Sequence, residues 1–517
     1  MCIASSVRRR WCAMFFRFLT AFAVIGAVPT LVIAQSPAPQ GEGSAATSGE
    51  HAGHDMTEMA REGSGTAWLP DESPMYALHA MRGPWTLMFH ENVFLQYFHE
   101  SGPRGDDQVG SINWFMGMAQ RNVGAGRLSL RGMFSLEPWS IRGCGYPDVL
   151  ASGEQCNGQQ IHDHQHPHDL FMELAAVYSA PLSGDVQWQV YAAPAGEPAL
   201  GPVAFPHRLS AMPNPLAPIT HHWFDSTHIT FGVVTGGLYG RKWKAEASVF
   251  NGREPDENRT NFDFAPLDSV SARFWYLPTS RLALQVSTGH LKDAEAGETP
   301  ASRITVNRVT ASATYHRPLG DSGIWASTLG WGRNAEPDHA SNALLLETSF
   351  TLNPHDTWFG RFEWVGKSAH DLDAATVTGD FTVGKLQGGY TRYLAAWNGF
   401  QPGVGAGLSV GIVPDTLKSL YGSRINTGIA AFLTLRPAAM TADAHAGHAA
   451  GSAPGGTGMV MVQTSLDPSR LTCSPPADRS TAAKTTYEGK TYYFCSVADR
   501  DKFLTDPKIS LSMMPPK

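Results

Sequence analysis

The sequence predicts an all-β protein, a transmembrane antiparallel β-barrel of about 16 strands, within a range of roughly 12 to 18. Apolar residues recur at every second position in segments of about ten residues, the length that a tilted strand needs to cross a bilayer. The connections between these segments mostly alternate between tight turns and long loops, as expected for a barrel with one short-turn rim and one long-loop rim. A small α+β segment is expected to follow the barrel.

The alternation is clear in residues 127–134, where the leucines and Phe134 share one face and both arginines share the other. Strands are the elements with this period. The same pattern recurs in residues 242–249, 281–286, 357–364 and 425–435. Such segments are expected to begin near Thr86, Ser111, Gly126, Leu170, Asp185, Ser226, Gly240, Asp268, Arg281, Ile304, Ser322, Asn342, Thr357, Phe381, Pro402 and Arg424.

The connections expected to be tight are residues 123–125, 181–184, 236–239, 278–280 and 353–356, and the long ones include 138–169, 194–225, 252–267 and 291–303. A soluble β-sandwich or propeller is the alternative interpretation. Aromatic residues near strand ends favour the membrane barrel, because interfacial girdles require them. These aromatics are Trp139, Trp188, Trp275, Tyr276, Trp331, Tyr393 and Trp397.

The N-terminus resembles an export signal, with Arg8 to Arg10 preceding an apolar stretch at 18–33 and a small-residue cleavage pattern. The barrel is therefore expected in the outer membrane of a bacterial cell, in contact with its lipid, with the C-terminal domain in the periplasm. The expected domains are a signal peptide at 1–34, a disordered periplasmic arm containing His and Met at 35–84, the barrel at 85–437, a flexible linker at 438–461 and a small domain at 462–517.

Export into an oxidising compartment favours disulfides, and Cys144 and Cys156 lie in one loop, so we expect them to be bonded. The formal net charge of −7 is modest, and the chain has no basic stripe. Nucleic acid is therefore not an expected partner. No phosphate-binding glycine loop, nucleophile elbow or metalloprotease helix occurs in a credible context, so we expect neither an enzyme nor an organic cofactor.

Two histidine clusters stand in consecutive long loops, which are expected to lie on the same rim and could converge on one site. Imidazole and carboxylate at this density suit a borderline transition metal such as copper or zinc. The alternative is a pair of solvated polar loops. The candidate ligands are His162, His164, His166, His168 and Asp169 in the first loop, and His221, His222, Asp225 and His228 in the second.

The sequence allows more than one local geometry within these clusters. Alternate histidines from His162 to His168 would share one face of an extended chain, whereas Pro167 equally allows a compact chelating turn. Asp225 could be a ligand or could orient an imidazole.

A further His/Met motif, containing His51, His54 and Met56, precedes the barrel. Thioether donors select Cu(I), so this arm suits copper. The layout of a barrel behind a His/Met arm resembles the copper-resistance outer-membrane proteins. That resemblance implies metal ions as ligands and periplasmic metal-handling proteins as partners.

Residues 487–496, with Phe503 and Asp506-Pro507, make the region from about 462 to 512 resemble a YHS domain. This family is a small metal-associated module in which a hairpin presents a Phe-Cys-Ser turn. The resemblance carries over to Cys473, Cys495 and Asp499, although the spacing around Cys473 is altered and Asp499 replaces a cysteine of the family pattern. The two cysteines could hold metal as thiols or form a disulfide.

Together these features predict an outer-membrane barrel involved in transition-metal handling, with copper favoured, in efflux or tolerance. A general porin or structural barrel without a specific metal role is the alternative.

Overall fold

A computed structural model describes residues 61–296, 302–320, 322–337, 339–374, 376–439, 483–487 and 490–494. They form a closed antiparallel barrel of 16 strands, which confirms the predicted fold class. The wall strands are β2 (Trp85–Glu100), β3 (Asp107–Val123), β4 (Gly126–Phe134), β7 (Phe171–Ser183), β8 (Val186–Ala195), β9 (Val233–Tyr239), β10 (Trp243–Phe250), β11 (Ser269–Thr279), β12 (Leu282–Ala296), β13 (Arg303–Leu319), β14 (Gly323–Ala335), β15 (Ala340–Thr351), β16 (Asp356–Ser368), β17 (Asp380–Tyr393), β18 (Phe400–Ile412) and β19 (Ile425–Pro437).

The last wall strand pairs with the first, from Gly428 opposite Glu100 to Leu435 opposite Val93, so the wall has no free edge. Most strands begin within a few residues of their predicted starts. β9 is the exception: the segment predicted from Ser226 begins at Val233, and the turn predicted at 236–239 lies inside β9. The reason is local, because Ser226–His228 form a 3-10 helix that belongs to the lumen instead of the wall.

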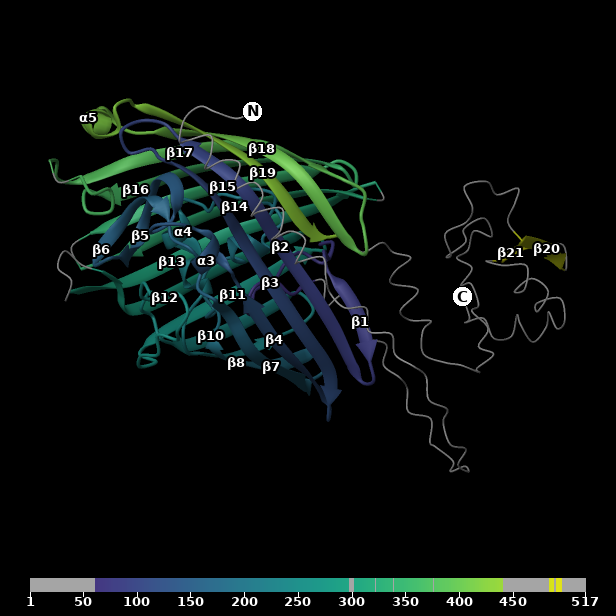
Figure 1. Cartoon of the computed structure of the whole chain (residues 1–517). Coiled ribbons are helices and arrows are strands. Elements are labelled where there is room, and N and C mark those ends of the chain that lie inside the picture. The colour runs from purple at the N-terminus through teal and green to yellow at the C-terminus, as the bar shows by residue number, and fades with distance from the viewer. Residues whose placement is uncertain are drawn as a thin grey trace, which may run out of the picture. The chain divides into compact units, whose positions relative to one another are not determined.

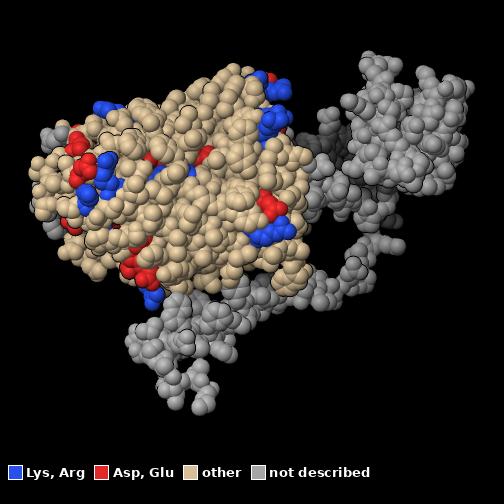
Figure 2. All heavy atoms as spheres, turned by 90° about the horizontal axis from the view of Figure 1, so that it is seen from above, with Lys and Arg blue, Asp and Glu red and all other residues tan. Residues whose placement is uncertain are grey.

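The outward face of the wall is apolar and the inward face carries the charge. On β11, Val270, Phe274 and Tyr276 are exposed, whereas Ser271 and Arg273 between them are buried. Figure 2 shows an outer surface that is mostly free of charged residues, which gather towards the two ends of the barrel. This inversion of a soluble protein's pattern is what a bilayer around the wall requires. Trp275 and Tyr393, expected in the aromatic girdle, are instead buried, because the strand alternation turns them inward.

Two of the long connections fold into the lumen (Figure 1). The connection from β4 to β7 contains α3 (Glu137–Ser140) and the hairpin of β5 (Tyr146–Cys156) and β6 (Gln159–Gln165). The connection from β8 to β9 contains η1 (Phe205–His207), α4 (His221–Phe224) and η2 (Ser226–His228). We call the latter, residues 196–232, the crossing loop.

The crossing loop reaches the wall strands that lie far from its own ends. Asn214 donates a 2.8 Å hydrogen bond to Gln387 of β17, and Thr220 donates to Glu363 of β16 from its hydroxyl at 2.8 Å. Arg208, fully buried, donates to Glu347 of β15 at 2.6 Å. Hydrogen bonds to the opposite wall therefore hold this loop across the lumen.

The N-terminal residues 61–84 differ from the predicted disordered arm, because they adopt defined structure. Residues 61–77 pack inside the barrel, where Trp68 stacks edge-on against Tyr239 at 5.8 Å and Thr66 accepts a 3.0 Å hydrogen bond from Arg273. β1 (Leu78–Arg82) then pairs with the start of β2. A large aromatic residue in an otherwise small and polar segment supplies the apolar area that makes this packing favourable.

Short helices η3 (Asp415–Leu417) and α5 (Lys418–Tyr421) lie between β18 and β19. In the C-terminal region, β20 (Ala483–Tyr487) and β21 (Lys490–Phe494) form an antiparallel pair. Among the described residues, no helix is both long enough and apolar enough to span a membrane.

Candidate metal centre

Histidines from both long loops meet inside the lumen. The ring centroids of His168 and His228 are 5.3 Å apart, and those of His221 and His228 are 5.1 Å apart. His166 lies at the edge of the group, 6.3 Å from His221. All are buried. We call these four residues the histidine cluster, and the expected convergence of the two loops is confirmed.

Phe205 of the crossing loop packs against three members of the cluster. Its ring centroid is 5.8 Å from that of His168, 5.4 Å from that of His221 and 5.7 Å from that of His228. An aromatic wall of this kind excludes water and restricts the rotamers of the imidazoles that it touches.

Each member of the cluster has an oxygen acceptor opposite its Nδ1 atom. His168 Nδ1 lies 2.9 Å from Glu137 Oε1, and His221 Nδ1 lies 2.9 Å from Asp225 Oδ1. His228 Nδ1 lies 2.7 Å from the backbone oxygen of Asp225, and His166 Nδ1 is 3.2 Å from that of Pro167. Because carboxylate and carbonyl oxygens only accept, we assign the proton of His168, His221 and His228 to Nδ1 and the lone pair to Nε2. His166 receives no such assignment, because its Nε2 also lies 3.2 Å from Glu154 Oε1.

This arrangement is the one that metal-binding histidines adopt, with one ring nitrogen anchored by an oxygen and the other left for the ion. His228 Nε2 is buried and has no hydrogen-bond partner in the described part of the chain. The cluster thus holds anchored imidazoles in a site shielded from solvent. Among the described residues, however, the three ligand atoms that lie within 4.8 Å of one another are those of His222, Glu254 and Glu295, so ions at the cluster would require its rings to move closer.

Asp225 orients its neighbours instead of facing the centre of the cluster. Its Oδ2 accepts 2.9 Å hydrogen bonds from Arg208 and from the backbone of Phe205, while Oδ1 accepts from His221. Arg208 is fixed in turn by Glu347. Burial alone would raise the pKa of Asp225, but Arg208 and His221 outweigh it and lower that pKa below its usual value. Of the two roles left open by the sequence, the geometry supports that of orienter.

Three of the four rings in the cluster are uncharged. Burial lowers the pKa of His221, and lowers the pKa values of His166 and His228 well below the usual range, so these rings are neutral at neutral pH. His168 differs: burial lowers its pKa, but the adjacent Glu137 carboxylate outweighs burial and raises it.

His222 belongs to a second group of potential ligands. Its Nδ1 lies 2.9 Å from Glu254 Oε1, and single ligand atoms of His222, Glu254 and Glu295 all lie within 4.8 Å of one another. We call these three residues the carboxylate group. The His222 ring is 5.5 Å from that of His221, so the group adjoins the histidine cluster. Burial raises the pKa of Glu254 to about 7.

Gly153 of the β5–β6 hairpin is packed against His222. A Cβ atom at this position would lie 2.0 Å from His222 Nε2, and the backbone φ of +124° is one that side chains rarely adopt. The hairpin can therefore cover the ring only with glycine here.

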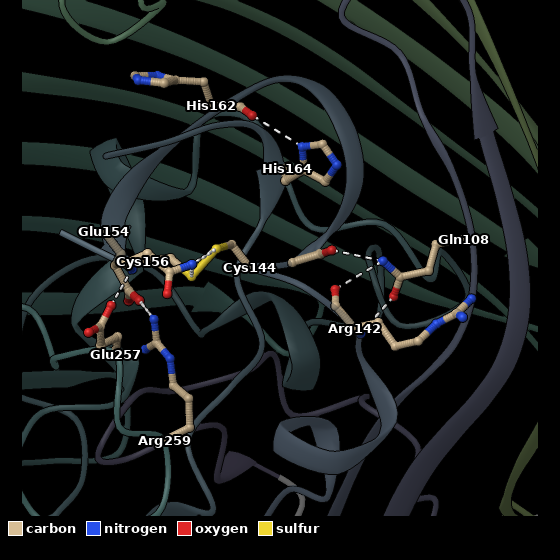
Figure 3. The surroundings of a disulfide bond; sticks show 11 residues. Gln108, Arg142, Cys144, Glu154, Cys156, His162, His164, Glu257 and Arg259 are labelled. Atoms are coloured by element: carbon tan, nitrogen blue, oxygen red, sulfur yellow. Dashed lines mark hydrogen bonds and ion pairs between the residues drawn. A yellow bond between two sulfur atoms is a disulfide. The ribbon is translucent and has the colours of Figure 1, made fainter. Parts of the chain in front are cut away.

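His162 and His164 lie apart from the cluster. They alternate along β6, as an extended chain requires, and line a cavity near Asp106 and the disulfide (Figure 3). His164 Nε2 is 3.5 Å from Asp106, and its Nδ1 is 3.2 Å from the backbone oxygen of His162. β6 ends at Gln165, and residues 166–169 form neither a strand nor a turn before β7 begins at Phe171, so the compact chelating turn is not formed.

The predicted disulfide between Cys144 and Cys156 is confirmed. Close to it, Arg259 forms an ion pair with Glu154 (Figure 3) and lies 3.4 Å from Asp169. Asp169 is thus engaged by arginine, and burial raises its pKa to about 7.

Sequence reasoning missed Glu137, Glu254 and Glu295. Each lies in a long connection or at a strand end, about 30 residues or more along the chain from the histidine beside it, and Glu254 and Glu295 stand among other acidic residues that have no such role. Placement in long connections was the only signal. His51, His54 and Met56 in the arm, and Cys473, Cys495 and Asp499 near the C-terminus, lie outside the described residues.

The fold and the buried cluster define a β-barrel of the outer-membrane type whose lumen is occupied by its own loops. Among solved structures, the chain is similar to OmpF of Salmonella typhi in complex with daunomycin, at 10% identity and a TM-score of 0.43 over 69% of this chain and 100% of that chain.

It is also similar to an anion-selective porin from Comamonas acidovorans, at 10% identity and a TM-score of 0.42 over 68% of this chain and 99% of that one. The outer-membrane channel DcaP of Acinetobacter baumannii matches at 7% identity and a TM-score of 0.39, over 68% of this chain and 98% of that one. No family model matches the chain, and no curated protein matches it.

Proposed function

We propose that this outer-membrane barrel binds a transition-metal ion at the histidine cluster and serves in copper or zinc handling, by efflux, sequestration or tolerance. One observation carries the proposal. His168, His221 and His228 approach one another in a buried site with their Nδ1 atoms anchored by oxygens, which leaves Nε2 of each ring for an ion.

The donor set supports copper and zinc in particular. Neutral imidazole suits both ions, and three protein nitrogens with an open position are a common zinc arrangement. The carboxylate group beside the cluster adds two acidic side chains, Glu254 and Glu295, to one imidazole. Harder oxygen donors next to nitrogen donors suit a second divalent ion there.

The occupied lumen argues against a general porin. Porins of this size keep a water-filled channel, whereas other barrels are closed by loops. Here the crossing loop is hydrogen-bonded to β15, β16 and β17, and residues 61–77 occupy further space in the lumen. A specific, gated cargo fits this arrangement better than free diffusion.

The test is titration of the purified full-length protein in detergent with Cu(II) and with Zn(II). A variant with His168→Ala, His221→Ala and His228→Ala should lose at least one equivalent of bound metal. The matched control, His162→Ala with His164→Ala, should retain it, because those rings lie outside the cluster. Equal stoichiometry in the wild type and the triple variant, together with open-channel conductance, would favour the general porin instead.

We also propose that the C-terminal segment is a YHS-like module that exchanges metal with periplasmic metal-handling proteins. The antiparallel pairing of β20 with β21, ending at Phe494, supports a hairpin that leads into the Phe-Cys-Ser turn. Thiol labelling of the unfolded, unreduced protein tests this. Labelling of Cys473 and Cys495 would leave them available as ligands, whereas a failure of both to label would indicate a disulfide and end the metal role.

A further inference from the structure

A second set of donors lies on the lumen face of β2, β3 and β4. Met116 of β3 stands directly opposite His90 of β2 on one side and opposite Met133 of β4 on the other. Met88 and Met118 form the next pair on the same face. Directly opposed residues bring their Cβ atoms to within about 5.5 Å. Three adjacent strands therefore present a row of imidazole and thioether side chains to the lumen.

The crossing loop places another imidazole on this row. His207 Nε2 lies 3.3 Å from Met133 Sδ, and the His207 ring centroid is 5.5 Å from that of His90. Trp114 covers the two rings, with centroids 4.6 Å from His207 and 5.1 Å from His90. Donors from the wall and from the loop thus face one another across a small space.

That space is a cavity of about 80 Å³, several times the room that one water molecule needs. Its lining includes Met75, Met88, Met116, Met118, Met212 and both histidines. The lining carboxylate, that of Glu62, is held by Arg127 at 2.9 Å and Arg131 at 2.8 Å. The remaining side-chain donors that line the cavity are uncharged: thioether sulfur, imidazole nitrogen and the phenol oxygen of Tyr76.

One of the two histidines that line the cavity has a ring nitrogen without a hydrogen bond in the described part of the chain. His90 Nε2 is buried and has no hydrogen-bond partner among the described residues. Leaving a buried polar atom without a hydrogen bond destabilises the fold.

Methionine also serves as adaptable packing, and Met172 does so in the same apolar cluster. If these residues served only to fill space, however, leucine would do so equally well, and the unpaired imidazole of His90 would have no role. Thioether and neutral imidazole together select soft ions, whereas harder divalent ions prefer oxygen ligands.

We propose that His90, Met116, Met118 and His207, which all line this cavity, bind a soft monovalent cation, Cu(I) or Ag(I), there. Met133 does not line the cavity and contacts His207 from beside it. The inference rests on the proposed function for its biological role, but its ligands are separate from the histidine cluster. Residues of the 61–77 segment line the cavity, and in the sequence this segment follows His51, His54 and Met56 closely.

The experiment measures Ag(I) and Cu(I) affinity of the full-length protein in detergent, without oxygen and against a competing chelator. Met116→Leu with Met118→Leu keeps the side-chain volume and removes two sulfur atoms that line the cavity, and should weaken binding by more than about tenfold. Met172→Leu is the matched control, since Met172 is buried in the same cluster but does not line the cavity. X-ray absorption of Cu(I)-loaded wild-type protein should show sulfur neighbours.

Wild-type affinity in the double variant, or absorption spectra with nitrogen and oxygen neighbours alone, would overturn the inference. Heat-modifiable migration on a gel shows whether each variant is folded. If the double variant does not fold, the X-ray absorption spectrum of the Cu(I)-loaded wild type tests the inference by itself. The two proposals fail separately. The triple histidine variant should retain Ag(I) binding while losing Cu(II) or Zn(II), and loss of soft-ion binding alone would leave the histidine cluster intact.

Discussion

Replacing Asp225 with asparagine tests whether the histidine cluster depends on its orienting carboxylate. Asp225 accepts hydrogen bonds from three groups, the His221 ring, the Arg208 guanidinium and the Phe205 backbone. An amide offers one oxygen and one NH₂ group. If the oxygen stays on His221, the NH₂ group faces two donors. If the amide turns round, His221 must accept at Nδ1, which moves its proton to Nε2 and removes the lone pair from the metal.

Either outcome weakens metal binding. Loss of the group that orients a metal-bound imidazole costs about 10- to 100-fold in affinity, which corresponds to about 1.4–2.7 kcal/mol. Arg208 keeps its pairing with Glu347 at 2.6 Å. The loss of folding stability should therefore not exceed about 3 kcal/mol, the lower end for breaking a buried pair.

The assay is a Cu(II) or Zn(II) titration of Asp225→Asn beside Asp148→Asn. Asp148 is equally buried and forms a 2.6 Å ion pair with Lys385, but it hydrogen-bonds to no histidine. Only Asp225→Asn should lose metal affinity, although both variants should lose stability in urea. Wild-type affinity in folded Asp225→Asn would refute the assigned tautomer and, with it, the orienting role.

Three further predictions concern the loops around the cluster. Gly153→Ala should destabilise the hairpin and weaken metal binding at His222 by collision with that ring, whereas Gly158→Ala, which has a positive φ but open space around it, should show backbone strain alone in urea unfolding. Glu254→Gln with Glu295→Gln should remove a Zn(II) equivalent, measured by titration, while Glu257→Gln should not. Cys144→Ser with Cys156→Ser opens a short loop, with a sequence separation of 12, and should increase proteolysis of that loop; the disulfide is worth up to about 3 kcal/mol.

Most of the wall could be predicted because a lipid-facing strand imposes its period on every second residue. The prediction failed at β9, where Ser226, Thr227 and His228 belong to the lumen and a single chain cannot reveal which polar residues leave the wall. It also differed for residues 61–84. Trp68 was the signal available in that segment, because disordered segments contain few large aromatic side chains.

The candidate site was only partly accessible to sequence reasoning. Density alone singled out His168, His221 and His228, but their partners Glu137 and Arg208 stand in unremarkable loop sequence. The row of His90, Met116 and Met133 left a weaker trace. Met116 lies on the same strand phase as Gln120, which faces the lumen, so its thioether points inward where the pattern calls for polar residues. These three side chains lie side by side because of the pairing register between β2, β3 and β4. That register cannot be read from the local sequence of any one strand.

One short segment of the crossing loop serves both candidate sites. Phe205 packs on the histidine cluster, His207 lines the sulfur-lined cavity, and Arg208 fixes the carboxylate that orients His221. Opening the lumen requires this segment to move, and its movement would dismantle both sites at once. An ion bound at either site would therefore stabilise the closed lumen by the difference in its affinity for the closed and open states. If ions bind at the two proposed sites, metal occupancy opposes opening of the lumen, and release of the ion would have to accompany opening.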